Sequence, residues 1–545
     1  MSRRAQPTDP AAIGRRLLGV PTLYRHPRIW TGDPNHPWVT SLLVDGERVV
    51  ATGDVDETVD LPGELVIPGL HDAHIHTGWM ARSMADVDLR PTRSLDEALA
   101  RIEAHAAARP AGEWLFGGWW DMNLWSPSVW PDRWAVDAVS GDHPIALSSR
   151  DGHSMWANSA ALQAVGITRD TVDPDGGAID RTPSGDPTGL LREAAGRGLE
   201  ALQTTDLGGD LSVLLPRLQE HLLSLGVTAV TDIDGEDVRA AYLAMAAAGA
   251  LNIRVVKCLP TTALDVAIAD GRRTGDGDDW VRTGPMKIFS DGALGSHSCD
   301  MHRGFHGDED NQGIEVTDSD LLWQLASRAT DHGIALTTHA IGDRANTRVL
   351  DVYERLRDEG VTLPLRIEHA QHLRPDDVPR FASLNVIASV QPTHATSDMD
   401  LADDLLSGHD VLQYPTRTLL DAGALVAFGT DAPVELPDPM ATLYAAVTRQ
   451  RPDGTPPGGW HPEERVTLEQ ALSAHTTGSW LAAGGFTAAG RLTEGQLADF
   501  VALDTDVFAA DSPSAISRAR AVRTVVGGVT RWSAAGDQGA SSSKS

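Results

Sequence analysis

The sequence predicts an α/β protein: a (β/α)8 TIM-like barrel with a small β-sandwich domain formed by both termini and an insertion over the barrel mouth. Between residues 66 and 485, eight strand-like apolar runs alternate with amphipathic helical segments. A second observation is that β-rich runs recur near both ends of the chain. An open doubly wound sheet is the alternative, and the absence of Gly-x-Gly-x-x-Gly after the first strand favours the barrel.

The terminal runs predict one small β domain. Residues 38–44 and 48–52 flank Asp45-Gly46, which is typical of a hairpin. Residues 498–503 and 522–529 have a similar composition. We therefore expect residues 1–65 and 486–532 to form this domain together, with little structure before about residue 20 and a disordered tail at 533–545.

The barrel is expected over residues 66–485. Its first strand is the run Val66–His76, and seven more follow at residues 227–232, 253–256, 286–289, 334–339, 365–369, 386–390 and 425–431. Helices are expected at 318–332 and 344–359, among others. Several strands follow a glycine that can end the preceding helix in a left-handed conformation, at Gly226, Gly333, Gly360 and Gly423.

Residues 77–210 are too long for a single strand-to-helix connection and predict the insertion. Six tryptophans are concentrated in it: Trp114, Trp119, Trp120, Trp125, Trp130 and Trp134. We expect most of these rings to pack the core of the insertion and one or two, with Trp119 as the candidate, to line an apolar substrate pocket. His153, in Asp151-Gly152-His153, either donates to a substrate carbonyl or oxyanion or ties down a loop.

Composition limits the kinds of partner. The formal net charge of −31 argues against nucleic acid and anionic membranes, although acidic surfaces also serve solubility alone. Only Cys258 and Cys299 occur, so we expect neither a disulfide framework nor a thiolate metal cluster. With no signal peptide and no apolar run of spanning length, the prediction is a cytoplasmic protein with a small-molecule substrate, for which a homodimer is one option.

Polar residues gather at the carboxyl ends of the predicted strands. His74 and His76 alternate with Ile75, so both side chains project to one side and can reach one ion. Since the chain has 20 histidines, such a pair also arises by chance. A barrel, however, would bring this pair to one mouth with four more groups: Lys287, His339, His369 and Asp431. This nitrogen and oxygen set suits zinc and its neighbours, and the lack of cysteine ligands argues against a closed structural site.

These residues resemble the amidohydrolase superfamily. The resemblance rests on Val66–Leu70 leading into Asp72–His76, on His339, on His369 in Arg366–His369, and on Asp431 in Phe428–Pro433. Four further motifs are similar to its YtcJ-like branch, which is related to N-substituted formamide deformylases: Asp151–His153, Lys287–Gly292, His339–Ala345 and Gly495–Asp499. His71 departs from the pattern, because family members more often carry an apolar residue there.

The resemblance implies a site for one or two divalent ions, with zinc the expected metal. His74, His76 and Asp431 would hold one ion and His339 and His369 the second, and a carboxylated Lys287 would bridge them. The alternative for Lys287 is a free amine that pairs with Asp291 or Asp431. Asp291 is also expected to contact the substrate. Glu368 and Asp343 either orient ligand imidazoles or serve as helix caps and solvent-exposed groups.

The expected function is hydrolysis of a non-peptide C–N bond in an N-acyl or N-formyl amine. Metal-activated hydroxide would attack the carbonyl, Asp431 would act as general base and then acid, and His153 would stabilise the oxyanion. Alternatives are a mononuclear-metal deaminase or lactonase on the same barrel and a non-catalytic binding or regulatory member. Deaminases of the superfamily usually carry His-x-x-Glu, whereas His339 is followed by Ala340-Ile341-Gly342. Serine-hydrolase and phosphate-loop motifs are absent.

Overall fold

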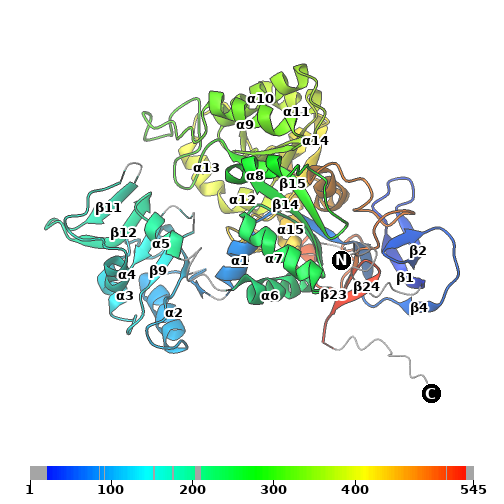
Figure 1. The fold of residues 1–545 in the computed structure, drawn as a ribbon, viewed down its shortest axis with the longest axis horizontal. Helices are drawn as coiled ribbons and strands as arrows, with labels where there is room; N and C mark the ends of the chain where they lie inside the picture. Colours follow the sequence, from blue (N-terminus) through cyan, green and yellow to red (C-terminus); the bar gives the residue numbers. More distant parts are fainter. Residues whose placement is uncertain are drawn as a thin grey trace, which may run out of the picture.

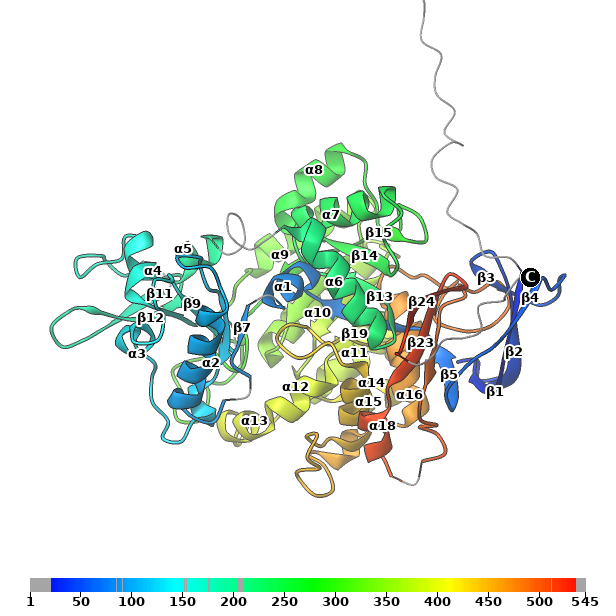
Figure 2. The same ribbon diagram turned by 90° about the horizontal axis from the view of Figure 1, so that it is seen from below.

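Three sheets organise the protein. The structure, a computed structural model, describes residues 21–535 except 85, 91, 151, 153, 175–176, 203–209 and 511. Figure 1 shows an insertion sheet on the left, the barrel in the centre and a sheet from both termini on the right. The view from below (Figure 2) shows the same order, so the insertion and the terminal sheet lie at opposite ends of the barrel. The segments predicted to lack structure fall mostly outside the described residues.

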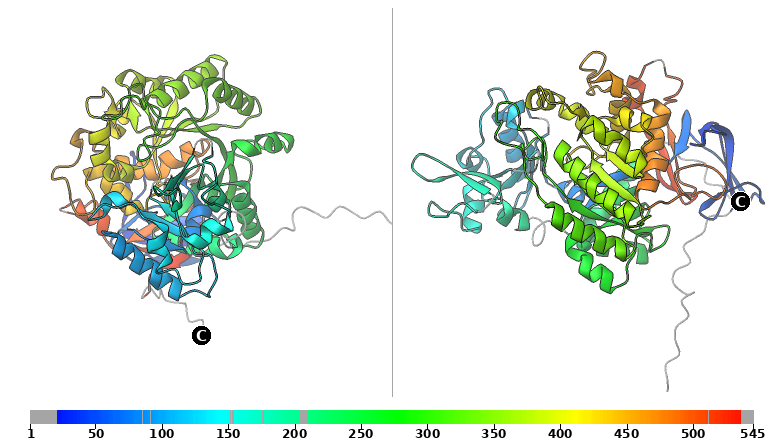
Figure 3. Two further views of the ribbon diagram at one scale, coloured as in Figure 1. Left: turned by 90° about the vertical axis from the view of Figure 1, so that its left-hand side faces the viewer. Right: turned by 90° about the horizontal axis from the view of Figure 1, so that it is seen from above.

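The central sheet confirms the predicted barrel. Eight strands pair in parallel in the order β6, β13, β14, β15, β16, β17, β19 and β21. Their bounds are Leu70–Ile75, Val227–Asp232, Arg254–Pro260, Val281–Phe289, Leu336–Ala340, Leu365–His369, Val386–Val390 and Val426–Phe428. The backbone N–H of Asp431 donates to the carbonyl of His74 at 2.7 Å, which joins the end of β21 to the end of β6. Helices surround these strands (Figure 3).

Amphipathic helices cover the outside of the barrel. The two predicted segments correspond to α9, capped by Asp318, and α10, whose bounds are Ser319–Asp331 and Asp343–Asp358. The other helices from the barrel onward are α6 Leu211–Ser224, α7 Glu236–Ala247, α8 Leu264–Ala269, α11 Val378–Ser383, α12 Pro392–Ser397, α13 Met399–Leu405, α14 Thr416–Asp421, α15 Pro439–Thr448, α16 Leu468–Ser473, α17 Ser479–Ala482 and α18 Ser514–Arg518. No helix within the described residues is long and apolar enough to cross a membrane.

The terminal sheet joins strands from both ends of the chain. Its order is β24-β23-β22-β5-β1-β2-β3, with β4 pairing beside β1. The bounds are β1 Thr22–Trp30, β2 Trp38–Asp45, β3 Arg48–Val50, β4 Glu57–Asp60, β5 Leu65–Pro68, β22 Phe500–Leu503, β23 Ala521–Val526 and β24 Val529–Ser533. An ion pair ties this sheet to the barrel, because buried Arg254 of β14 donates to Asp499 at 2.6 Å.

The run Val66–His76, predicted as one strand, is two strands in the structure. β5 belongs to the terminal sheet and β6 to the barrel, and Gly69 separates them. A Cβ at Gly69 would lie 2.3 Å from Oγ1 of Thr228, so only glycine allows this close approach. The chain thus enters the barrel just before the two histidines.

The insertion forms its own mixed sheet in the order β11-β12-β10-β9-β8-β7. The strands are β7 Val87–Asp88, β8 Gly117–Trp120, β9 Ala146–Ser149, β10 Ser154–Ala157, β11 Gly177–Arg181 and β12 Pro187–Glu193, with helices α2 Leu95–Ala107, α3 Arg133–Asp137, α4 Ser159–Ala164 and α5 Arg197–Ala201. Trp120 and Trp125 pack its core, whereas Trp130 and Trp134 are 51% and 46% exposed.

The insertion contacts the mouth of the barrel. Arg90 donates to the carbonyl of Pro433 at 2.7 Å, and Arg150 pairs with Glu435 at 3.1 Å. Both partners follow β21, next to Asp431. Helix α1 (Thr77–Ser83), which precedes the insertion sheet, packs with α6 on the barrel.

Candidate metal centre

The six predicted ligands lie at or near the carboxyl ends of five barrel strands: His74 and His76 at β6, Lys287 at β15, His339 at β16, His369 at β17 and Asp431 at β21. The backbone φ angle is positive at His369 (74°) and Asp431 (58°). Residues other than glycine adopt this conformation rarely, and it persists where the surrounding structure fixes a side chain in place.

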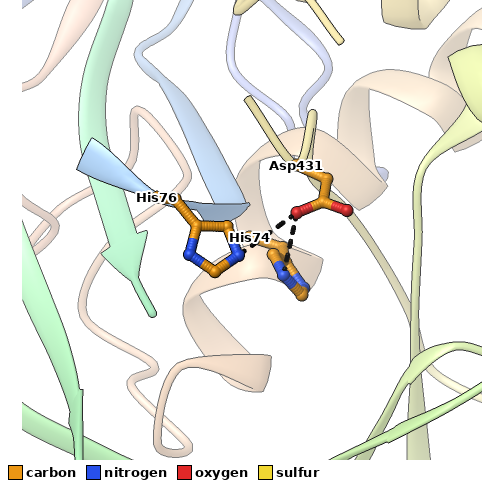
Figure 4. A group of neighbouring side chains, drawn as sticks. All are labelled: His74, His76 and Asp431. Atoms are coloured by element: carbon orange, nitrogen blue, oxygen red, sulfur yellow. Dashed lines mark ion pairs between the residues drawn. The ribbon is translucent and has the colours of Figure 1, made fainter. Parts of the chain in front are cut away.

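His74, His76 and Asp431 form a first group of ligand atoms (Figure 4). Nε2 of His74 lies 3.2 Å from Oδ1 of Asp431, and Nε2 of His76 lies 3.5 Å from the same oxygen. Ligand atoms bound at about 2.1 Å to one ion lie roughly 3 to 4 Å apart, so this spacing suits a shared ion. We call His74 and His76 the first imidazole pair.

Carboxylates hold the other nitrogens of the first imidazole pair. Nδ1 of His74 donates to Oε2 of Glu368 at 2.6 Å, and Nδ1 of His76 donates to Oδ1 of Asp234 at 2.7 Å. Glu368 is fully buried and also accepts from Arg366. Because each Nδ1 carries the proton, each Nε2 presents its lone pair towards Asp431.

A second buried ion pair supports Asp234. Nζ of Lys257 lies 2.9 Å from Oδ1 of Asp232 and also donates to the backbone carbonyl of Asp234. Asp232 accepts from the backbone N–H of Thr77 at 2.9 Å, which fixes the start of α1. The loop carrying Asp234 is therefore held on the same side as His76.

His369, His394 and Asp431 form a second group of ligand atoms within 4.8 Å of one another. Nδ1 of His369 donates to Oε1 of Gln391 at 2.9 Å, and Nε2 of His394 lies 3.9 Å from Oδ2 of Asp431. The two rings are nearly parallel, at 9°, with centroids 6.1 Å apart. We call His369 and His394 the second imidazole pair.

His339 faces a different way. Its Nε2 lies 3.2 Å from the carbonyl of Gly292 and 3.4 Å from Oδ1 of Asp291, although its ring centroid is 4.4 Å from that of His369. Neither group of ligand atoms includes His339. Its Nδ1 is the nitrogen left for an ion.

Lys287 is buried beside these histidines. Its Nζ has no hydrogen-bond partner among the described residues and lies 4.7 Å from the ring centroid of Phe289. Burial lowers the pKa of Lys287 from its usual value. A neutral amine is the form that reacts with carbon dioxide, so this environment is compatible with a carboxylated lysine.

The charges at the mouth suit a cation. Burial alone would raise the pKa of Asp431, but the neighbouring His74 and His369 lower it well below its usual range. For Glu368 the effect of burial is likewise outweighed, by Arg366 and His74. Burial lowers the pKa of His369 well below its ordinary value, which keeps the ring neutral, the form that binds metals.

Asp72 and Gly429 fix the relative position of His74 and Asp431. The carboxylate of Asp72 accepts from the hydroxyl of Thr430 at 2.5 Å, the N–H of Thr430 at 3.0 Å and the N–H of His74 at 3.1 Å. A Cβ at Gly429 would lie 2.5 Å from the backbone nitrogen of His74. The sequence at both strand ends thus brings the ligands together.

The residues at the mouth fit a divalent ion. They offer imidazole nitrogens and carboxylate oxygens, and neither group of ligand atoms includes a cysteine. Nε2 of His394 and Nζ of Lys287 are buried without a hydrogen-bond partner among the described residues, as expected of atoms that would bind an ion or carry a modification.

Residues 57–531 match the model of the Amidohydrolase family. The chain belongs to the amidohydrolase family. Its relatives include Protein LONG AFTER FAR-RED 3 of Arabidopsis thaliana, which is 33% identical over 96% of this chain and 92% of the relative. Putative amidohydrolase YtcJ of Bacillus subtilis is 29% identical, with 87% and 90% covered, and N-substituted formamide deformylase of Arthrobacter pascens is 30% identical, with 93% and 97% covered. The predicted resemblance is confirmed.

A solved structure agrees with this amidohydrolase assignment. An uncharacterized metal-dependent hydrolase from Pyrococcus horikoshii superposes with a TM-score of 0.74 at 27% identity, over 90% of this chain and 98% of the other. This amidohydrolase is therefore a metal-dependent hydrolase with a TIM-like barrel.

Trp119, a predicted substrate-binding residue of this amidohydrolase, is linked to the first group through Trp79. Its ring centroid is 5.1 Å from that of Trp79, which in turn is 5.7 Å from that of His76. Phe289, 46% exposed, packs against His339 with centroids 5.5 Å apart. These rings offer apolar walls near the candidate ligands.

The other predicted roles stay predictions. Asp291 accepts from the backbone N–H groups of Gly342, Asp300 and Ile341 at 2.8, 3.0 and 3.1 Å, and burial raises its pKa to about 7. These bonds anchor the loop after β15, and they favour a positioning role over direct contact with a substrate. His153 lies outside the described residues.

His71 and Asp343 belong to neither group of ligand atoms. Nε2 of His71 pairs with Oγ1 of Thr231 at 2.9 Å, and its ring packs against Trp480. Asp343 accepts from the backbone N–H of His302 at 2.9 Å and orients no candidate ligand.

Sequence reasoning missed His394, Asp234 and Trp79. His394 and Trp79 lie within helices α12 and α1, and Asp234 lies two residues beyond β13, whereas the predicted ligands lie at strand ends. The signal for His394 was the polar segment Gln391-Pro392-Thr393-His394 directly after a strand. The loops following all eight strands, and not only their last residues, contribute to the mouth of such a barrel.

Proposed function

We propose that this amidohydrolase cleaves a non-peptide C–N bond in an N-acyl or N-formyl amine and that His74, His76 and Oδ1 of Asp431 hold the required divalent ion, zinc. The observation that carries the proposal is the convergence of both Nε2 atoms on one oxygen of Asp431, at 3.2 and 3.5 Å. The similarity to an N-substituted formamide deformylase supports the bond type.

When bound, the ion would lower the pKa of a water molecule and polarise the carbonyl oxygen of the substrate. Asp431 supplies the proton transfer. Its Oδ1 faces the first imidazole pair, while Oδ2 makes no hydrogen bond among the described residues and lies 3.9 Å from Nε2 of His394. Oδ2 accepts a proton from the attacking water and delivers it to the nitrogen as the C–N bond breaks. The products are a carboxylic acid and an amine.

The apolar rings would orient the substrate. Trp79 packs against His76, Trp119 packs against Trp79, and Phe289 packs against His339. The substituent on the substrate nitrogen or acyl group would pack between these walls, which exclude water from the reacting carbonyl. His153 is our candidate for a further donor to the carbonyl oxygen.

The test is amine release from a panel of N-formyl and N-acyl amines by zinc-loaded full-length protein. We expect hydrolysis of at least one class, and Asp431→Asn should lower kcat by roughly 10²- to 10⁴-fold. Asp60→Asn, at an exposed ion pair with Arg25, is the control and should leave kcat unchanged. Activity confined to lactones, or ammonia release from ring amines only, would contradict the proposal.

Carboxylation of Lys287 is a separate prediction. Its buried and unpartnered Nζ and the neighbouring His339 and His369 support it. Intact-protein mass under native conditions with and without bicarbonate would detect the added carbon dioxide, and Lys287→Met should remove this difference.

A further inference from the structure

The two oxygens of Asp431 face different imidazole pairs. Oδ1 lies 3.2 and 3.5 Å from Nε2 of His74 and His76, whereas Oδ2 lies 3.9 Å from Nε2 of His394. His369, His394 and Asp431 also bring one ligand atom each within 4.8 Å of the others. We propose that His369, His394 and Oδ2 of Asp431 form a second divalent-ion site, occupied after the first. This inference rests on the proposed function for the role of Asp431.

Nε2 of His394 is the atom that points to a ligand. It is buried, with His394 only 7% exposed, and has no hydrogen-bond partner among the described residues. Its distance of 3.9 Å from Oδ2 is too long for a hydrogen bond. The same distance suits two ligands of one ion. Bonds of about 2.1 Å place two ligand atoms roughly 3.0 to 4.2 Å apart, depending on the angle between them at the ion.

The Nδ1 atoms of His369 and His394 each face a glutamine side chain. Nδ1 of His369 donates to Oε1 of Gln391 at 2.9 Å, which leaves Nε2 as the free nitrogen. The two rings are stacked nearly parallel, at 9°. Both Nε2 atoms can therefore turn to one point beside Asp431.

A hydrogen-bond chain also assigns the tautomer of His394. The amide of Gln371 lies between Nδ1 of His394, at 3.4 Å, and the hydroxyl of Tyr414, at 3.1 Å. Tyr414 has one proton, and it donates that proton to Oδ2 of Asp398 at 2.7 Å. In the structure Oε1 of Gln371 faces Tyr414 and Nε2 of Gln371 faces Nδ1 of His394. Because Tyr414 gives its proton to Asp398, we assign the amide of Gln371 the opposite orientation, in which it donates to Tyr414 and its oxygen faces Nδ1 of His394. His394 donates from Nδ1 and keeps a lone pair on Nε2.

This site differs from the one that the family resemblance implies. That arrangement uses His339, His369 and a carboxylated Lys287. In the structure, Nε2 of His339 lies 3.2 Å from the carbonyl of Gly292, and His339 belongs to neither ligand group. The site proposed here needs no modified lysine.

Occupation of the second site would stop the reaction. Oδ2 of Asp431 is the atom that accepts the proton of water in the proposed function, and an ion bound to Oδ2 would occupy one of its lone pairs and make the oxygen too weakly basic for that role. Neutral glutamines contact the second pair, so its ion should bind more weakly than the first. Activity should therefore rise with the first equivalent of zinc and fall in excess zinc.

The experiment is a zinc titration of chelator-treated full-length protein, read by metal content after equilibrium dialysis and by amide hydrolysis at each point. Wild type should bind two ions with unequal affinity. His394→Ala should bind one ion, and the ratio of its rate at one equivalent to its rate in excess zinc should fall to about 1. Lys287→Met should keep both ions. His372→Ala removes a buried imidazole outside both groups and controls for packing.

Two results would overturn the inference: one ion in wild type at saturating zinc, or loss of the second ion in Lys287→Met with retention in His394→Ala. Failure of the proposed function can be distinguished from failure of this inference. If wild type and Lys287→Met bind two ions and His394→Ala binds one, but no amide is hydrolysed, the second site is supported and the proposed function is rejected. Amide hydrolysis by a protein that binds one ion would support the proposed function and reject the second site.

Discussion

The two imidazole pairs share Asp431 but differ in the residues that contact their Nδ1 atoms. Carboxylates hold the first pair, since Glu368 accepts from His74 and Asp234 accepts from His76. Glutamines contact the second pair, and they carry no charge. A carboxylate behind an imidazole raises its basicity and fixes its tautomer, whereas an amide does only the latter. The comparison teaches that one aspartate can serve two sites of unequal strength.

Glu368→Gln would break the first pair most severely. Arg366 is fully buried and donates to Glu368, so the substitution leaves its charge unpaired and should lower the free energy of unfolding by about 3–5 kcal/mol. Affinity for the first ion should fall as well. Urea unfolding and zinc titration measure the two effects. Asp60→Asn, at an exposed ion pair, should cost about 1 kcal/mol or less, and equal losses in both variants would refute the argument.

Asp234→Asn would weaken the first pair with less effect on the fold. The amide can still accept from Nδ1 of His76 but lacks the charge. We expect the first ion to bind about 10- to 100-fold more weakly. Competition with a zinc chelator of known affinity gives the dissociation constant. An unchanged value would show that the charge behind His76 has no influence on the ion.

Gln391→Glu would make the second pair resemble the first. A carboxylate then accepts from Nδ1 of His369, and affinity for the second ion should rise about 10-fold. The same chelator competition, carried out beyond one equivalent of zinc, detects this change. If the affinity of the first ion rises instead, the two pairs are not separate sites.

A pH series tests a third environment, in which buried imidazoles have a nitrogen with no hydrogen-bond partner in the part of the chain that the structure describes. Burial lowers the pKa of His372 to about 3 and that of His475 to about 4. Both rings stay neutral in the folded protein but gain protons near pH 6.5 when unfolded. Stability is therefore complete above about pH 6.5 and is lost as the pH falls towards 4, by about 1.4 kcal/mol per pH unit for each group.

Urea unfolding of metal-free protein at pH 7, 6 and 5 measures this slope. His372→Phe should reduce the slope by about 1.4 kcal/mol per pH unit, because the phenyl ring fills the site and takes up no proton, while the other buried histidines keep their contribution. A slope that His372→Phe leaves unchanged would exclude His372 as the source of the acid sensitivity.

The sequence alone predicted the barrel and the positions of the candidate ligands, because both depend on local patterns. Strand ends such as Arg366–His369 carry their own periodicity, and a barrel gathers such ends at one mouth. The split at Gly69 was missed because it results from contact with Thr228, which is distant in sequence. His394 was missed for a similar reason: its role depends on the orientation of α12 towards Asp431.

Anomalous diffraction from zinc-soaked crystals of the full-length protein tests the central claim most directly. At one equivalent of zinc, the account predicts a peak about 2.1 Å from Nε2 of His74, Nε2 of His76 and Oδ1 of Asp431. An ordered zinc elsewhere in the barrel mouth, with these three atoms left uncoordinated, would contradict it.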